Sequence, residues 1–290
     1  MLPRFAAEEI WDLVARERVT NMNIVGEAMA RPLLAALPHA SEPVTCLQSI
    51  ATGGAPLSLE TRGGLLAALP HIIVKDSYGS SETGVHGWAV HSVGRRAAGF
   101  TVVDTVLLDP VTRRLLPVAS KQPGLVARRR RVPLRYRGDE EKSKATFLTV
   151  DGRRCALTGD LAMMNADGTL QLLGRESQCI NSGGEKIHPE EVELALRAHP
   201  DVDDAVVVGV ADERWGQVVV AVVAPRLGSA PREEDLRVHC RSRLAGYKVP
   251  KRVLAVVAVQ RTVAGKLDYR WANQIAADAL KQVDAGGEPV

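Results

Sequence analysis

Helical and strand-like patterns alternate along the first part of the chain, and this alternation restricts the folds that are open to it. Apolar residues recur at helical spacing from Ala6 to Arg18, and a short strand-like segment, Met22 to Val25, follows. The pattern then repeats, with helices predicted at Glu27–Leu37 and Ser58–Leu69 and strands at Cys46–Ala51 and His71–Lys75. Alternating strands and helices predict a parallel sheet covered by helices, whose ligands lie beyond the carboxyl ends of the strands.

Two glycine-containing loops are predicted at such strand ends, ATGGAPLS (51–58) and DSYGSSETG (76–84). The second offers an aromatic ring, flexible glycines, hydroxyls and a carboxylate, which are the groups needed to hold a nucleotide and its metal. The alternative is an ordinary Gly/Ser-rich turn after a strand, and one short motif does not decide between them.

The remaining sequence has two further patterns of apolar and turn-forming residues. After Gly94, short valine and leucine runs are broken by turn signals at Asp109-Pro110, Asp151-Gly152 and Asp167-Gly168, which predicts an antiparallel β region. Beyond the linker GRESQ (174–178), helices are predicted at Pro189–His199, Arg232–Leu244 and Tyr269–Gln282, and strands at Ala205–Val210, Val218–Ala224 and Val253–Val259. We therefore expect an α/β part (1–93), a β-rich part (94–175) and a separate α+β domain (176–290).

Charge and composition exclude several classes of protein. The 290 residues carry 37 basic and 34 acidic side chains, and a net charge of +3 gives no global reason to expect nucleic acid or an anionic membrane as a partner, so any partner must be argued from local features. The apolar runs are shorter than the ~20 residues that cross a bilayer, so no transmembrane segment is expected. Four widely separated cysteines predict neither a zinc site nor disulfides and favour a cytoplasmic location.

The one basic run, Arg128–Arg131, is interpreted as a solvated edge strand whose charges oppose aggregation. Nucleic-acid binding also requires stacking aromatics, and aromatic residues make up only 4% of the chain.

Three later segments hold candidate functional residues that also have simple structural interpretations. Asp160, in TGD (158–160), is either a residue that follows a hairpin turn or an acceptor for a ribose diol. The segment 174–193 is either a linker before a capped helix or a glycine-bearing site at a domain junction. Lys266 is either solvated or placed to meet a phosphate whose charge grows in a transition state.

Taken in order, GGAPL, YGSSETG, LTGD, LLGRESQCINSGGEKIHPEEVE and RTVAGKLDY closely resemble the carboxyl-terminal half of the adenylate-forming superfamily. That superfamily comprises acyl-CoA synthetases, nonribosomal-peptide adenylation domains and firefly-type luciferases. The resemblance extends from about Phe5 to Trp271, and its GGEK loop and GKLDY ending are most similar to fatty-acyl-CoA ligases. It implies the remnant of a parallel α/β sheet, an antiparallel β-barrel-like subdomain and a small mobile α+β domain.

The resemblance also implies a role for each motif residue. Glu82 would bind Mg²⁺, Ser81 would contact phosphate where relatives usually have threonine, and Lys266 would reach the α-phosphate and the acyl carboxylate. Tyr78 would pack on adenine, Asp160 would accept both ribose hydroxyls, and Ser177 would be the hinge. The other implied nucleotide-binding residues are Gly53, Gly54, Ala55, Gly79, Ser80 and Arg175, and the implied CoA-binding residues are Gly183, Gly184 and Lys186.

The implied reaction joins a carboxylic acid to CoA through an acyl-adenylate, with ATP and CoA as co-substrates. One departure stands out, because relatives have a Ser/Thr/Gly-rich phosphate loop upstream and this sequence has none. We therefore expect the isolated chain to have impaired activity. It would be a fragment, a shortened gene product or one half of a split enzyme. Its expected protein partner is a separate N-terminal half or a second copy of the chain. An adenylation domain that loads a carrier protein and a non-catalytic nucleotide-binding or interaction remnant stay open as alternatives.

The segment PLRYR holds a further departure: it places Arg135 and Arg137 where relatives tend to have a glycine and a second aromatic residue. Cys155 likewise replaces a common aromatic.

Overall fold

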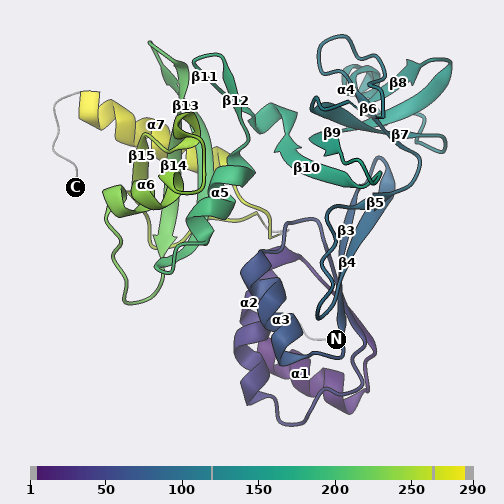
Figure 1. The fold of residues 1–290 in the computed structure, drawn as a ribbon, viewed down its shortest axis with the longest axis vertical. Coiled ribbons are helices and arrows are strands. Elements are labelled where there is room, and N and C mark those ends of the chain that lie inside the picture. The colour runs from purple at the N-terminus through teal and green to yellow at the C-terminus, as the bar shows by residue number, and fades with distance from the viewer. Residues whose placement is uncertain (1–4, 119, 263–264, 285–290) are drawn as a thin grey trace. The chain divides into compact units, whose positions relative to one another are not determined.

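A computed structural model describes residues 5–118, 120–262 and 265–284, with the side chains of the last helix described to residue 280 (Figure 1). The chain divides into two compact units, Met1–Leu172 and Leu173–Val290, and each is described by itself. The domain boundary expected at 175/176 remains a prediction.

The first unit begins with a sheet that has helices on one face. Its strands follow the order β1-β2-β3-β4-β5, in which β1, β2 and β3 are parallel and β4 and β5 are antiparallel additions. Trp11 is fully buried and donates its indole N–H to the Leu33 carbonyl over 2.8 Å, and Ile50 and Val74 extend this core from the sheet. The elements are α1 (Ala7–Arg16), β1 (Asn21–Ile24), α2 (Gly26–Ala36), β2 (Ser49–Gly53), α3 (Leu59–Ala68), β3 (Ile73–Ser80), β4 (Gly84–His91) and β5 (Thr101–Val102). The predicted helix-covered parallel sheet is therefore confirmed.

The segment DSYGSSETG was expected to be a loop after a strand, and the structure corrects this. Strand β3 continues through Asp76 to Ser80 and turns directly into β4, so that Ser77 pairs with Trp88 and Tyr78 with Gly87. The polar and glycine residues of this segment led to the prediction of a loop where the strand in fact continues. Their backbone groups are satisfied by an antiparallel partner strand, β4, which lies further along the chain. Strand β2 likewise runs on to Gly53, inside the segment expected to be a loop.

The second sheet of this unit has the order β10-β9-β7-β6, with β8 paired to β9. The pairs β6/β7, β7/β9 and β8/β9 are antiparallel, as expected, and Asp151-Gly152 forms the turn between β8 and β9. Helix α4 was not predicted, because it is a short polar segment, Glu140–Thr146, whose first turn is capped by Asp139. The strands are β6 (Thr105–Leu108), β7 (Gly124–Arg129), β8 (Phe147–Val150), β9 (Arg153–Met164) and β10 (Leu170–Arg175).

Strand β7 lies inside its sheet, with β6 on one side and β9 on the other. The interpretation of Arg128–Arg131 as a solvated edge strand is therefore wrong.

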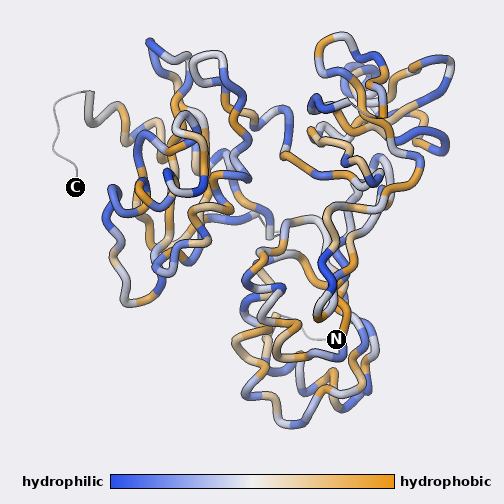
Figure 2. The backbone as a smooth tube through the Cα atoms, viewed as in Figure 1, coloured by the Kyte–Doolittle hydropathy of each residue, from blue (hydrophilic) through white to orange (hydrophobic). Residues whose placement is uncertain are grey.

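The second unit has one sheet, of order β12-β11-β14-β13, with β15 parallel to β14. The valine-rich strands β13 and β14 pair over their whole length and are buried on both faces, which explains why their sequences are apolar without alternation (Figure 2). Helices α5 and α6 pack on one face through Leu196 and Leu236, and α7 packs on the other through Ala272. The elements are β11 (Ile180–Ser182), β12 (Glu185–Ile187), α5 (Pro189–Arg197), β13 (Val202–Asp212), β14 (Gly216–Pro225), α6 (Glu233–Arg241), β15 (Arg252–Ala255) and α7 (Tyr269–Asp284).

Among the described residues, no helix combines the length and the apolar character that a membrane crossing requires.

Candidate active site

The residues singled out in the sequence divide between the two units. The first unit holds Gly53, Gly54, Ala55, Tyr78, Gly79, Ser80, Ser81, Glu82 and Asp160. The second holds Arg175, Ser177, Gly183, Gly184, Lys186 and Lys266.

Tyr78 and Asp160 meet where the two sheets of the first unit come together. The Tyr78 hydroxyl donates to Asp160 Oδ2 over 2.7 Å and lies 3.1 Å from Thr158 Oγ1. Asp160 lies within β9 and not after a hairpin turn, which corrects that interpretation. Tyr78 is 8% exposed, and its ring stacks on His86 with ring centroids 5.1 Å apart. Two distant motifs thus form one polar contact at the rim of an aromatic cluster.

His86 is fully buried behind Tyr78 and shares a hydrogen bond of 2.8 Å with the Thr105 hydroxyl. Burial, assisted by the nearby Arg128 guanidinium, lowers the pKa of His86 to about 4. The imidazole is therefore neutral near pH 7, and Tyr78 stacks on an uncharged ring.

Glu82 lies in the turn between β3 and β4 beside an exposed Ser81. Its Oε1 accepts a 2.7 Å hydrogen bond from the Tyr136 hydroxyl, and this bond holds the pKa of Glu82 below its ordinary value although burial opposes the shift. The Lys142 ammonium lies 4.2 Å from the centre of the Tyr136 ring. Glu82 is therefore an ionised carboxylate near a positive charge.

A lone ionised carboxylate fits a Mg²⁺ ion that arrives with its nucleotide, because Mg²⁺ is usually bound through one or two carboxylates and substrate phosphates. The described residues contain no cluster of three or more His, Cys, Asp or Glu side chains that could form a closed metal cage.

The turn that carries Ser81 and Glu82 is closed tightly. Ser80 N donates to Thr83 Oγ1 over 3.2 Å, and Thr83 is buried. A side chain on Gly79 would come within 2.3 Å of the Gly84 carbonyl oxygen, so only glycine fits there.

The loop after β2 is held by the start of α2. Gly26, with φ +48°, lies so close to Ala55 that a Cβ atom on it would come within 2.6 Å of the Ala55 Cβ. Glu27 accepts hydrogen bonds from Ser58 N (2.9 Å), Ser58 Oγ (3.1 Å) and Thr61 Oγ1 (2.5 Å). The Glu27 carboxylate therefore fixes the end of this loop at Ser58 and the first turn of α3 at Thr61. This role of Glu27 was not predicted from the sequence. A Gly-Glu pair at the start of a helix was the available signal.

In the second unit, Gly183 and Gly184 form a two-residue hairpin turn between β11 and β12, closed by the pair Ser182 and Glu185. Both glycines have positive φ, +58° and +89°, which tight hairpins of this kind require. The linker expected before the helix is thus partly a hairpin. Gly183 N donates to the Trp215 carbonyl over 2.8 Å, and a Cβ on Gly183 would strike the Trp215 ring at 2.7 Å.

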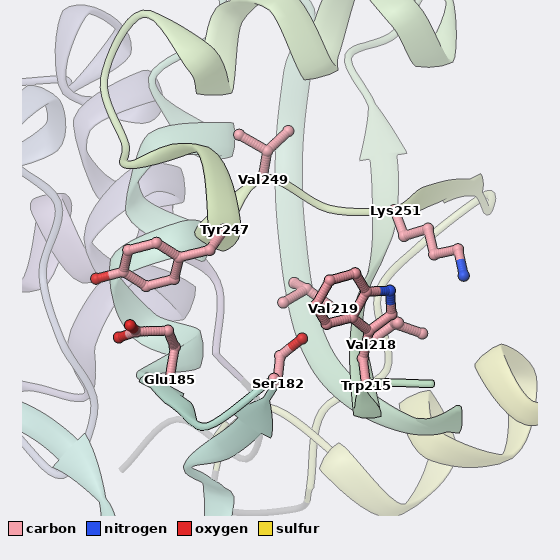
Figure 3. A pocket seen from close by; sticks show the side chains of 9 residues that line it. Ser182, Glu185, Trp215, Val218, Val219, Tyr247, Val249 and Lys251 are labelled. Atoms are coloured by element: carbon pink, nitrogen blue, oxygen red, sulfur yellow. The ribbon is translucent and has the colours of Figure 1, made fainter. Parts of the chain in front are cut away.

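A pocket of about 250 Å³ opens beside this hairpin (Figure 3). Trp215 and Tyr247 are 44% and 47% exposed, and their rings flank the Ser182 hydroxyl in this view. Lys251 lies at the edge and is bound to Asp212 over 2.9 Å. This pocket was not predicted from the sequence, although an aromatic residue beside glycine or lysine in a loop (WGQ, GYK) was a usable signal. The lining is Ser182, Gly183, Glu185, Trp215, Val218, Val219, Tyr247, Val249 and Lys251.

The candidate hinge begins where β10 ends. Arg175 is the last residue of β10, and Ser177 is exposed in the short 3-10 helix Glu176–Gln178. Gly174, one residue before the end of β10, has φ +124°, a backbone conformation that is strained for a residue with a side chain. Lys186, in β12, is exposed.

Lys266 projects from a small loop whose residues 263 and 264 lie outside the described residues. Thr262 N donates to the Lys266 carbonyl over 2.8 Å, which closes the loop. Arg261 donates to the Gly265 carbonyl (2.9 Å) and to Asp204 Oδ2 (2.6 Å), and so ties the loop to β13. The exposed Lys266 side chain therefore belongs to a loop that is anchored to β13.

A buried polar cluster joins α5, β13 and the start of α7. Glu193, 1% exposed, accepts hydrogen bonds from Val207 N and the Tyr269 hydroxyl, each over 3.0 Å, and lies 3.7 Å from Arg197. Burial raises the pKa of Glu193 to about 7, although Arg197 opposes the shift.

This raised pKa predicts a pH-dependent stability. The folded protein binds the Glu193 proton more tightly than the unfolded chain does, so the stabilisation is complete below about pH 4.5 and is lost as the pH rises to about 7. At 1.36 kcal/mol for each pKa unit, the loss amounts to about 3 kcal/mol. Urea unfolding at both pH values should show this difference between the wild type and Glu193→Gln. Parallel pH profiles of the two proteins would contradict it.

Residues 191–266 match the AMP-binding enzyme C-terminal domain family. The chain is 45% identical over 279 residues to a medium/long-chain-fatty-acid–CoA/3-oxocholest-4-en-26-oate–CoA ligase of Mycobacterium marinum, covering 94% of this chain and 50% of that protein.

Two solved structures share the fold at 26% identity. The amide bond synthetase McbA from Marinactinospora thermotolerans aligns with a TM-score of 0.84 over 96% of this chain and 56% of its own. ATP-bound MatB from Rhodopseudomonas palustris aligns with a TM-score of 0.79 over 96% and 55%. The chain spans about half the length of the relatives that it matches. Its resemblance to the adenylate-forming superfamily is confirmed, and the chain corresponds to the carboxyl-terminal half of that superfamily.

Proposed function

We propose that this chain supplies the nucleotide and thiol sites of an acyl-CoA ligase that activates a carboxylic acid with ATP. The observation that carries the proposal is the 2.7 Å hydrogen bond between Tyr78 and Asp160, which joins two motifs 82 residues apart. The name of the Mycobacterium marinum relative supports a medium- or long-chain fatty acid, or a steroid carboxylic acid, as the substrate class. Four free cysteines suit a reducing compartment, so we place the activity in the cytoplasm.

In the first half-reaction, a carboxylate oxygen attacks the α-phosphorus of ATP and pyrophosphate leaves. We assign the Tyr78 ring to adenine, Asp160 with Arg175 to the ribose hydroxyls, and Ser81 to phosphate. Gly53, Gly54 and Ala55 would line the adenine and acyl pocket, and Gly79 and Ser80 would present backbone to the nucleotide. Similarity to ATP-bound MatB supports a nucleotide site in this fold.

Two groups would stabilise the negative charge on the phosphates. Mg²⁺ held by Glu82 would neutralise part of the negative charge on the phosphates. The Lys266 ammonium would stabilise the charge that develops at the α-phosphate, where a preorganised cation has its largest effect. Because Lys266 belongs to the second unit and Ser177 lies near its start, we propose that rotation about Ser177 delivers this lysine.

In the second half-reaction, the CoA sulfur attacks the acyl carbonyl carbon and AMP leaves. We assign the Gly183-Gly184 hairpin and Lys186 to this step. The pocket beside Gly183 adds two exposed rings and the Lys251 ammonium, groups that suit the base and the phosphates of CoA.

The proposal is tested by giving the chain a preformed fatty acyl-adenylate and CoA and measuring acyl-CoA by mass spectrometry, with the same mixture without protein as the control. Thioester formation above the control supports an acyl-CoA ligase. Transfer to the phosphopantetheine of a carrier protein, but not to CoA, would identify an adenylation domain instead. AMP binding without transfer to either thiol would identify a non-catalytic remnant.

A further inference from the structure

The basic run at the end of β7 has no role in the chemistry above, and the structure removes its simplest explanation. Arg128 pairs with Thr105 of β6 on one side and with Ala156 of β9 on the other, so these charges do not protect a sheet edge. Arg130 and Arg131 continue the run beyond the end of the strand.

Contacts bring this run together with the start of β9. Arg154 donates to the carbonyl oxygens of Pro133 and Leu134, each over 2.9 Å. Arg129 lies 3.8 Å from Asp151 in the turn between β8 and β9. We call the resulting surface the arginine surface, and define it by six exposed residues, Arg130, Arg131, Arg135, Arg137, Arg153 and Arg154.

Positive charge is concentrated here far above the average of the chain. Residues 128–154 contain eight arginines and two lysines against four acidic residues, a net charge of +6, whereas the whole chain has +3. Arg130 is paired with Asp104 at 3.3 Å. Within the part of the chain that the structure describes, four members of the surface have neither a side-chain hydrogen bond nor an ion pair: Arg131, Arg135, Arg137 and Arg153.

An apolar tip lies among these charges. Leu134 is 81% exposed, and it follows an exposed Pro133 and a partly exposed Val132. We propose that the arginine surface docks the protein on anionic phospholipid membranes. The arginines would meet the lipid phosphates and carboxylates, while Leu134 enters the boundary between headgroups and acyl chains.

A membrane fits this surface better than nucleic acid does. Proteins that bind single strands stack bases on free aromatic rings. Residues 128–137 contain one aromatic side chain, Tyr136, whose hydroxyl is bonded to Glu82 and whose ring face is covered by Lys142. The docking proposal needs only the first unit and does not depend on the proposed ligase reaction.

Sedimentation with lipid vesicles tests the proposal. We expect binding to phosphatidylcholine vesicles that contain about 30% phosphatidylserine and none to pure phosphatidylcholine, with loss of binding between about 0.1 M and 0.5 M salt as charge is screened. The fourfold variant Arg131→Gln, Arg135→Gln, Arg137→Gln, Arg153→Gln should bind about 600-fold more weakly, because each arginine near an anionic surface contributes roughly fivefold. The same four positions changed to lysine should retain binding.

The matched control removes four exposed arginines that lie elsewhere, with Arg18→Gln, Arg95→Gln, Arg114→Gln and Arg270→Gln. It makes the same change in net charge and should bind as the wild type does. Leu134→Ser should weaken binding without changing its salt dependence. The proposal is overturned if the wild type does not bind anionic vesicles or if the arginine-surface variant binds them as tightly as the wild type. It is also overturned if the control variant loses as much affinity as the arginine-surface variant. Binding to an RNA homopolymer without vesicle binding would assign the surface to nucleic acid.

Discussion

Replacing Asp160 with alanine is expected to weaken AMP binding by about 100-fold or more. In the proposed site this carboxylate accepts both ribose hydroxyls, and a hydrogen bond to a charged group contributes about 1.5–3 kcal/mol. Two such bonds correspond to two or more factors of ten in affinity, at about 1.4 kcal/mol each. Calorimetric titration of the wild type and of Asp160→Ala with AMP measures the difference.

Tyr78→Phe is the matched control for this experiment. It removes the hydroxyl that donates to Asp160 Oδ2 but keeps the ring that stacks on His86, so AMP binding should weaken far less than in Asp160→Ala. Unchanged AMP binding in Asp160→Ala would remove the nucleotide assignment and favour an interaction module.

Acid-dependent pyrophosphate release by the 290-residue chain is expected to be undetectable, while acyl-CoA formation from supplied acyl-adenylate proceeds. Adenylation requires the ATP triphosphate to be held while charge develops at the α-phosphate, and this sequence contains no Ser/Thr/Gly-rich phosphate loop. Removing one preorganised donor costs about 10²–10³ in rate, and a whole loop supplies several donors. An acyl-adenylate carries no triphosphate, so the second step needs only the ribose contacts, the Gly184 hairpin and CoA.

Lys266→Ala separates the two half-reactions within this experiment. The lysine is assigned to the α-phosphate in the adenylation step. Its removal should therefore leave the rate of thioester formation from acyl-adenylate within about threefold of the wild-type rate. Removing a group that stabilises both transition states would slow this step tenfold for each 1.36 kcal/mol of lost stabilisation. Gly183→Val is the contrasting variant, because its side chain would strike the Trp215 ring at the proposed thiol site and should abolish this step. Robust ATP-dependent acyl-CoA synthesis by the chain alone would contradict the expected defect.

Local patterns were sufficient for elements whose partners are close in the sequence or whose burial is uniform. Helix α1 and the strands β13 and β14 were predicted because helical spacing and unbroken valine runs are properties of neighbouring residues. The extension of β3 through Asp76 to Ser80 was not predicted, because its polar residues become a strand only when β4 pairs with them.

The candidate site, too, depends on contacts between residues that are far apart in the sequence. The motifs named Tyr78, Glu82, Asp160 and Lys266 one by one, but no spacing could show that the Tyr78 hydroxyl bonds to Asp160. The sequence also gave no indication that Tyr136 donates to Glu82, since each residue fits several surroundings.

The sequence by itself determined the order of α/β, antiparallel and α+β regions and the motifs of the adenylate-forming superfamily, because periodicity and turn chemistry are encoded in neighbouring residues. Only the tertiary structure decided which of those residues meet. It placed β7 inside its sheet and buried Glu193 against Tyr269. Among the residues that it describes, it also left Arg131, Arg135 and Arg137 without a side-chain partner near the exposed Leu134. The physical reason is that burial, pairing and the shift of a pKa depend on groups far away in the chain, which come together only when the sheets form.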